Sequence, residues 1–126
     1  MKILTIVESA FRTLVEELDD TILWLNQTVK KAGADISIIL SGNASQYAFM
    51  KKTAPAITIG DWKQKSPANI PDDIQRILDS GVSVYVYSDD IAQRGLKLNT
   101  MFPGVKLLSR YQALHLYNQA DQIWQW

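Results

Sequence analysis

A run of β-branched and aromatic residues in the second half of the chain predicts a central strand. Residues 82–87 read Val-Ser-Val-Tyr-Val-Tyr, a pattern typical of strands that helices cover on both faces. Ser88, Asp89 and Asp90 follow directly, and a hydroxyl cap with acids in the first turn predicts a helix start. Gly95 predicts the end of that short helix, because a left-handed cap needs a residue without a Cβ. In an open α/β sheet, ligands gather at such a strand–turn–helix junction.

Periodic and alternating patterns predict the remaining elements. Apolar residues at three- and four-residue steps predict a long helix over 11–32, with a stripe formed by Phe11, Leu14, Val15, Leu18, Ile22, Leu25 and Val29. The predicted strands are 1–7, 35–40, 82–87, 105–108 and 122–126. The other predicted helices are a short one capped by Asn43 and ending near 51–52, one over 71–79, one over 88–95 and one capped by Ser109.

The order of these elements predicts the fold class. Strands alternate with helices along residues 1–126, which indicates a single α/β domain. We expect a three-layer α/β/α sandwich around a five-stranded, mainly parallel sheet, flavodoxin-like in appearance. Residues 54–70 carry prolines, lysines and a glycine, so we expect mostly loop there with a short extended piece at 56–59. This segment is expected to act either as a flap over a site or as an interface arm.

The four tryptophans mark candidate contact surfaces. Trp24 lies on the polar side of its predicted helix, so either another subunit or a neighbouring loop is expected to cover it. Trp62 falls in the segment 54–70, while Trp124 and Trp126 share one face of the last predicted strand. All four are therefore candidate interface residues.

The charge balance and the lack of cysteine argue against several classes of function. Lys plus Arg and Asp plus Glu are equal at 13 each, so we expect no direct binding to nucleic acid or to an anionic membrane. We expect neither a signal peptide nor a bilayer-spanning run, which makes a cytoplasmic location the default. The chain has no cysteine, which excludes disulfides, thiolate metal sites and thiol nucleophiles. His115 is the only histidine; we interpret it as a packing or surface residue and expect no metal site or other cofactor.

The turn after the first predicted strand holds the phosphate or cofactor in several common ligand-binding sites of α/β proteins. That turn is Glu8-Ser9-Ala10, which lacks the glycines of a dinucleotide site and the hydroxyl- and glycine-rich loop of a flavin site. A phosphate-cradling P-loop is missing as well. A phosphate-accepting receiver domain needs a lysine after the last strand, and no lysine follows residues 122–126.

Polar residues are nevertheless expected to meet at the carboxyl edge of the sheet. The candidate ligand-binding residues there are Glu8, Ser9, Ser41, Gly42, Ser88, Asp89, Asp90 and Arg94. Backbone N–H groups at 88–90 can bind an anion and the carboxylates can bind a cation, although capping alone also explains these residue types. Arg94 can pair with Asp90 at i, i+4, which favours a structural ion pair.

Two stretches of the second half resemble a known family. The sequence VYVYSDDIAQRGL, followed by GVKLLSRYQALHLYNQADQIWQW, resembles the closing half of the DsrE/DsrF/DsrH (TusD/TusC/TusB) sulfur-relay proteins. It is most similar to the DsrH/TusB branch, whose acid-rich turn precedes Ala-Arg-Gly-Leu; here Gln93 replaces that alanine. The opening stretches MKILTIV and ISIILSGNA are similar to the general DsrE-type pattern.

This resemblance implies a DsrE-like domain without the family's chemistry. In DsrE-like members a sulfur-accepting cysteine follows the central strand, and by register from Arg94 the matching position is Tyr87. Because persulfide formation needs a thiol, this chain cannot itself carry sulfur. The resemblance therefore implies a non-catalytic, DsrH/TusB-like role in a homo- or hetero-oligomer with DsrE-like subunits.

Three functional hypotheses follow from the sequence. The first is a non-catalytic DsrE/DsrH-like subunit that works by protein contact and is linked to intracellular sulfur transfer. The second is a stand-alone domain that binds a small ligand or anion at the carboxyl ends of the strands. An enzyme that uses carboxylates at the same edge for acid–base chemistry is the third.

Overall fold

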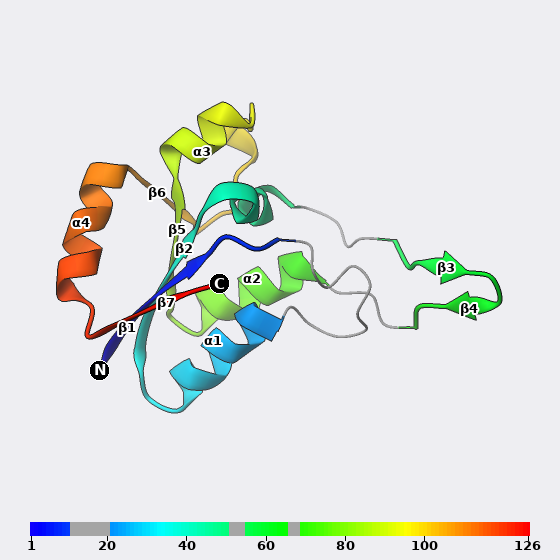
Figure 1. Cartoon of the computed structure of the whole chain (residues 1–126), viewed down its shortest axis with the longest axis horizontal. Helices are drawn as coiled ribbons and strands as arrows, with labels where there is room; N and C mark the ends of the chain where they lie inside the picture. Colours follow the sequence, from blue (N-terminus) through cyan, green and yellow to red (C-terminus); the bar gives the residue numbers. More distant parts are fainter. Residues whose placement is uncertain (11–20, 51–54, 66–68) are drawn as a thin grey trace.

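The computed structural model describes residues 1–10, 21–50, 55–65 and 69–126 and contains a five-stranded parallel sheet (Figure 1). Its strands are β1 (Lys2–Val7), β2 (Asp35–Leu40), β5 (Ser83–Tyr87), β6 (Lys106–Leu108) and β7 (Gln122–Gln125). They are arranged in the order β6-β5-β2-β1-β7, and every adjacent pair is parallel. The predicted α/β fold class is confirmed, and the predicted bounds of β2 are those observed.

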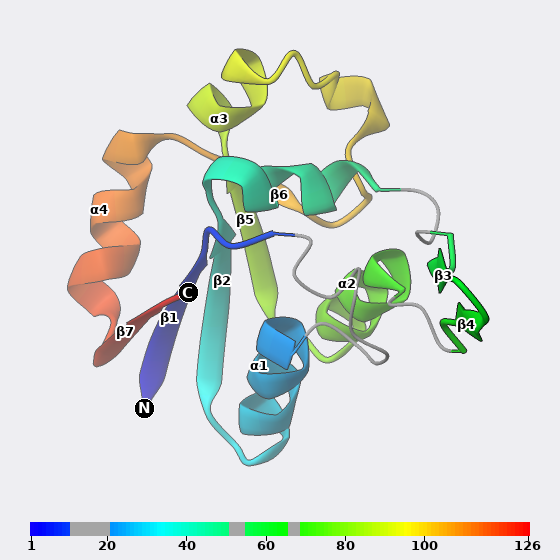
Figure 2. The same ribbon diagram turned by 45° about the vertical axis from the view of Figure 1, so that its right-hand side comes forward.

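Helices flank both faces of this sheet. Helices α1 (Thr21–Lys31) and α2 (Ile70–Asp79) lie side by side over one face, and α4 (Arg110–Gln119) lies over the other (Figure 2). The short helix α3 (Ser88–Gln93) and the 3₁₀ helices η2 (Gly42–Phe49) and η3 (Leu98–Thr100) complete the helical elements of the described residues. Among these helices, none combines the length and apolar character needed to cross a bilayer.

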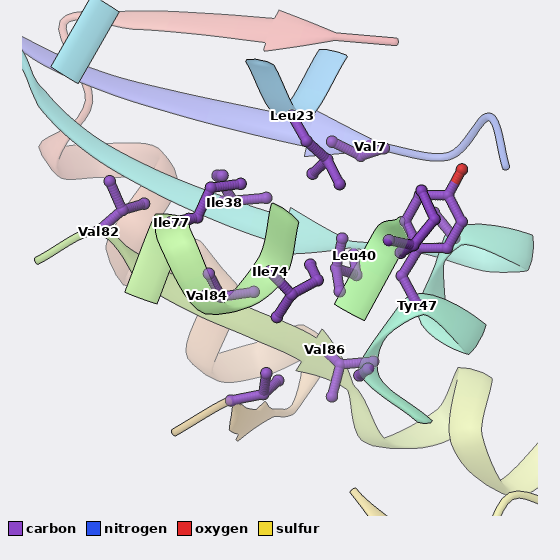
Figure 3. Packing of buried hydrophobic residues seen from close by; sticks show 14 of the residues in the cluster. Val7, Leu23, Ile38, Leu40, Tyr47, Ile74, Ile77, Val82, Val84 and Val86 are labelled. Atoms are coloured by element: carbon purple, nitrogen blue, oxygen red, sulfur yellow. The ribbon is translucent and has the colours of Figure 1, made fainter. Parts of the chain in front are cut away.

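The core has two parts because neighbouring side chains of a strand point to opposite faces. The larger part joins the central strands to α1, α2 and η2 (Figure 3), and its members include Val7, Leu23, Ile38, Leu40, Tyr47, Ile74, Ile77, Val84 and Val86. The smaller part lies under α4 and contains Leu4, Ile39, Tyr87, Leu108 and Ala113. A single helix covers this second face, so it leaves apolar side chains of the edge strand β7 exposed.

The inward face of α1 differs from the predicted stripe. Leu23 and Asn26 are buried, although neither belongs to the stripe, whereas Leu25 and Val29 are only half-buried. Asn26 faces the sheet because its Oδ1 accepts a hydrogen bond of 2.7 Å from the Thr5 hydroxyl of β1. Hydrophobic periodicity cannot detect such a polar inward residue. The predicted helical residues 11–20 lie outside the described residues.

The segment 54–70 contains a hairpin that the sequence analysis missed. Strands β3 (Thr58–Ile59) and β4 (Trp62–Lys63) pair antiparallel, so the expectation of loop after residue 59 was wrong. Gly60 has φ +57°, a conformation that suits a tight turn between two strands. In Figure 1 the hairpin extends away from the sheet. Residues 51–54, where the short helix was expected to end, and 66–68 lie outside the described part.

Helix caps were predicted with mixed success. Ser109 caps α4 as expected: its hydroxyl accepts from the Gln112 N–H, and the Gln112 side chain accepts from the Ser109 N–H. Two other predictions were wrong. The 3₁₀ helix η2 begins at Gly42, one residue before Asn43, and α3 begins at Ser88 itself without a side-chain cap.

The buried pair Thr5–Asn26 generates a first prediction. Replacing Asn26 by leucine removes the acceptor of the buried Thr5 hydroxyl, so the free energy of unfolding should fall by about 1–3 kcal/mol. Adding Thr5→Val should recover part of that loss, because the unsatisfied hydroxyl is then gone. Urea denaturation of the two single variants and the double variant measures this coupling. Strictly additive losses would show that the hydrogen bond contributes nothing specific.

Candidate functional site

The centre of the candidate site is the buried carboxylate of Asp90, on α3. Its Oδ2 atom accepts a hydrogen bond of 2.9 Å from the Gly42 N–H and one of 3.1 Å from the Arg110 side chain. Its Oδ1 atom lies 3.4 Å from Nη1 of Arg94. Because these donors belong to η2, α4 and the end of α3, one carboxylate joins three segments that follow different strands. We call Asp89, Asp90, Arg94 and Arg110, together with Gly42, the Asp90 cluster.

Arg110 forms the outer side of this cluster. Its guanidinium carbon lies 3.7 Å from the centre of the Tyr87 ring, a cation–π contact, while its Nε donates to Asp89 Oδ2 at 3.1 Å. Partial burial lowers the pKa of Arg110, but the hydrogen bond and negative charge of Asp89 outweigh burial and raise that pKa above its usual range. Arg110 therefore stays charged and holds two acids and one aromatic ring at once.

Asp89 is the exposed partner of Arg110. Slight burial raises the pKa of Asp89. The hydrogen bond from Arg110 and the positive charge of Arg110 lower that pKa by more, so it lies below its usual range. A lowered pKa means that the native state prefers the ionised carboxylate. This preference stabilises the fold above the unfolded-state pKa of Asp89 and is lost as the pH falls through the folded-state value.

Tyr87, the position at which the sequence resemblance expects a cysteine, is closed to solvent. It is buried beneath Arg110, and its hydroxyl lies 3.5 Å from that of Tyr117 on α4. Burial is the largest cause that raises the Tyr87 pKa above its usual value of 10.0, and the hydroxyl of Tyr117 raises it further. Arg110 opposes this shift without cancelling it. The position therefore holds a neutral, packed ring.

The structure divides the predicted site residues into two groups. Gly42, Asp89, Asp90 and Arg94 meet in the Asp90 cluster, and the predicted Asp90–Arg94 pair at i, i+4 is present. Ser41 is buried at the end of β2 and Ser88 is exposed at the start of α3, beside the cluster.

Glu8 and Ser9 form the second group, near β7. Their backbone N–H groups donate to the Trp126 carbonyl at 2.8 and 3.1 Å. This contact closes the turn after β1 against the end of β7. The backbone donors of this turn are therefore used within the fold, and binding by these two residues stays a prediction.

Sequence analysis missed Arg110, Asn43 and Tyr117 as members of the site. Asn43 Oδ1 accepts from Arg94 Nη2 at 3.2 Å, so this residue orients the arginine and does not cap a helix. The place of Arg110 could have been predicted from the topology, because Arg110 begins the helix after β6 and β6 is parallel to β5. The carboxyl ends of parallel neighbours share one edge, so the first residues after β6 must lie near Ser88–Asp90.

The electrostatics of the cluster favour a structural role. Two carboxylates face two guanidinium groups, so their formal charges cancel. The Gly42 N–H, which an anion would otherwise bind, already donates to Asp90. The described residues also contain no group of three or more His, Asp or Glu side chains suited to a metal ion. The arrangement therefore fastens η2, α3 and α4 at the edge of the sheet.

The predicted contact residues are placed differently by the structure. Trp24 is 52% exposed, and Trp62 and Trp126 are also exposed, whereas Trp124 packs partly against the larger core. No described element covers Trp24. Whether a partner covers these side chains stays a prediction.

Solved structures show what this fold is similar to. The chain aligns with the crystal structure of the ychN protein from E. coli at a TM-score of 0.75 and 15% identity, over 99% of this chain and 98% of that one. It also aligns with MTH1491, a protein of unknown function from Methanobacterium thermoautotrophicum (TM-score 0.63, 12% identity, 97% and 96% covered). BT1422 from Bacteroides thetaiotaomicron, also of unknown function, aligns at a TM-score of 0.64 and 17% identity (98% and 94% covered). No protein-family model and no curated protein matches the chain.

These alignments support the fold part of the sequence resemblance. The alignment with the ychN protein covers nearly the whole of both chains. At 15% identity the likeness shows the fold alone. The alignments therefore support the predicted α/β fold, and membership of the DsrE/DsrF/DsrH family stays a prediction.

The two neighbouring acids give a matched pair of variants. The Asp90 side chain is 7% exposed and that of Asp89 is 48% exposed. Asp90→Ala removes the shared acceptor and should lower the free energy of unfolding by about 2–4 kcal/mol, since its donors lose their partner. Asp89→Ala removes the same charge at an exposed site and should cost about 0–1 kcal/mol. Urea denaturation compares them, and equal losses would contradict a central role for Asp90.

The raised pKa of Tyr87 predicts a pH dependence of stability. Above about pH 10 the unfolded state loses the Tyr87 proton while the native state keeps it, so stability falls as the pH rises. Tyr87→Phe should make this alkaline decline shallower, as measured by urea denaturation between about pH 8 and pH 11. Tyr111→Phe is the control, because Tyr111 is 84% exposed and should leave the decline unchanged. Equal declines in all three proteins would refute the assigned role of Tyr87.

Proposed function

We propose that this chain is a non-catalytic DsrE/DsrH-like subunit that acts through protein contact, in an oligomer or complex linked to intracellular sulfur transfer. The observation that carries the proposal is the state of position 87. Where the sequence resemblance expects a sulfur-accepting cysteine, a buried tyrosine packs beneath Arg110. A DsrE-like fold with this position filled retains the shape of the family but not its nucleophile.

The chemistry of the chain supports a role without covalent sulfur. A persulfide forms on a thiolate, and the chain contains no cysteine. In the Asp90 cluster the formal charges cancel, and hydrogen bonds join the segments that follow β2, β5 and β6. A fixed surface suits recognition of another protein, since little ordering entropy is lost on binding.

Exposed aromatic side chains support protein contact as the mode of action. Trp24, Trp62 and Tyr111 are exposed on α1, β4 and α4 respectively. Tryptophan and tyrosine are enriched in protein interfaces because they bury a large area with few rotatable bonds. The β3–β4 hairpin, with Ile59 and Trp62 paired and exposed, has the form of an interface arm.

The alternative function, binding of a small ligand, has one observation in its favour. An open hollow of about 410 Å³ lies where the end of η2 meets η3, lined by Met50, Pro71, Asn99, Thr100, Met101, Phe102 and Pro103. Its volume and mainly apolar lining are typical of small-molecule sites. An anion at the Asp90 cluster is less favoured, because it would compete with Asp90 for the Gly42 N–H.

Affinity capture and light scattering test the proposal together. We expect the purified chain to have a defined solution mass above the 14.2 kDa of one copy, or to retain a cysteine-bearing protein of the same fold from its native extract. Mass spectrometry identifies that protein, and transfer of labelled persulfide sulfur by it, with and without this chain, tests the functional link. A chain that stays at 14.2 kDa at every concentration and retains nothing would reject the proposal.

A further inference from the structure

The sheet has two edge strands, β6 and β7, and they differ in how they are protected. Edge strands expose unpaired N–H and C=O groups, and charged residues, lysine above all, discourage pairing with another chain. The β6 edge carries such a residue: Lys106 is exposed, with its Nζ 5.7 Å from the centre of the Tyr85 ring. Both edge strands are short, with three residues in β6 and four in β7, so the charge on Lys106 is what distinguishes the β6 edge.

Strand β7, at the other edge of the sheet, carries no such charged residue. Its sequence, Gln-Ile-Trp-Gln, contains no charged residue and no proline, and Ile123 is 47% exposed. Trp126 follows, exposed as well. An unprotected apolar edge is a template for strand pairing, and a stable protein keeps one only where something covers it.

The absence of charge extends beyond β7 itself. From Tyr111 to Trp126 the only charged side chain is Asp121. Asp121 faces its own chain, since its Oδ2 accepts from the Lys2 N–H at 2.7 Å. The outer side of α4 exposes Tyr111 and Leu114. Few charges and many exposed aromatic and aliphatic groups distinguish the centres of interfaces from ordinary surface.

Apolar surface is present on both sides of the β7 edge. A shallow groove on the α1 side is lined by Leu25, Trp124, Gln125 and Trp126. Trp24, the residue before Leu25, is exposed on α1. Ile123 lies on the opposite, α4 side of the strand, because neighbouring residues of a strand alternate. A chain that paired with β7 would cover apolar groups on both sides of the edge.

We propose that β7 is the docking strand for a second copy of this chain, with the two β7 strands antiparallel about a two-fold axis. This inference rests on the proposed function, for which it supplies the partner and the surface. In such an interface residue i of one copy meets residue j of the other and j meets i, so a charge near the two-fold axis lies close to the same charge of the other copy. The β7 edge fits itself because it has none. The β6 edge would bring the two Lys106 side chains close together.

The geometry allows two registers. A two-fold axis normal to the sheet leaves every side chain on its own face. Opposite residues of the two β7 strands must point to the same face, so the axis lies at a residue position and not between two residues. With the axis at Trp124, Ile123 of one copy meets Gln125 of the other; with the axis at Ile123, the two Ile123 side chains meet. In both cases the tryptophans of the two copies lie on the same side, where aromatic cross-strand pairs add stability.

Two matched substitutions test the proposal. Ile123 and Leu107 are aliphatic residues of opposite edge strands, 47% and 42% exposed. Ile123→Lys should weaken self-association at least about a hundredfold, because in either register it places a charged side chain in the interface, near the same charge of the other copy. Leu107→Lys should leave self-association unchanged. Light scattering over a concentration series gives both dissociation constants, and thermal unfolding shows whether each variant is folded.

Cysteine cross-linking decides the matter if Ile123→Lys does not fold. The chain has no cysteine, so one introduced thiol is the only one present. Under mild oxidation, Ile123→Cys should form a disulfide-linked dimer by itself if the axis lies at Ile123. It should do so only when mixed with Gln125→Cys if the axis lies at Trp124. Leu107→Cys should form no such dimer.

The outcomes separate this inference from the proposed function. Self-association that is unchanged by Ile123→Lys, with no cross-link at β7, overturns the inference and leaves the proposed function standing. A wild-type chain that is monomeric and retains no DsrE-like partner rejects both. If the chain is monomeric but retains such a partner only when Ile123 is intact, β7 binds that partner, and the assignment to a second copy is wrong.

Discussion

The carboxylate of Asp90 is the interaction on which the carboxyl edge of the sheet depends. A buried carboxylate is stable only when donors replace the water that it has lost, and Gly42, Arg94 and Arg110 supply them. These donors follow β2, β5 and β6, so satisfying one charge also fixes how three strand ends are connected. The position of Arg110 over Tyr87 is a result of the same requirement.

The sheet was predictable from the sequence because its signals are local. Parallel strands covered on both faces are apolar runs, and Gly33 and Gly42 border the run at Asp35–Leu40, whose bounds were confirmed. The inward face of α1 was not predictable in the same way. A hydrophobic-periodicity analysis places a polar residue such as Asn26 on the outer face of the helix. Asn26 is nevertheless buried, because its side-chain oxygen accepts a hydrogen bond from Thr5, 21 residues earlier. The β3–β4 hairpin was not predicted because its strands have two residues each, both exposed, and so show no alternation of buried and exposed positions.

The candidate site was predictable as a place but not as a set of contacts. The topology rule brought Gly42, Asp89, Asp90 and Arg94 to one edge, and the structure places them there. It could not show that Asp90 and the Gly42 N–H satisfy each other, because that depends on the angle at which η2 leaves β2. Arg110 was overlooked since it lies 20 residues from Asp90, and only the register between β5 and β6 joins them.

The contact between Arg110 and Tyr87 also has an evolutionary meaning. One nucleotide change converts a tyrosine codon into a cysteine codon, and the guanidinium now stacked on the ring would then lie near a thiol. A neighbouring arginine lowers the pKa of a thiol and so favours the nucleophilic thiolate. At this buried position the guanidinium would oppose the rise in thiol pKa that burial causes. One nucleotide therefore separates this protein from a variant that has a thiol at position 87.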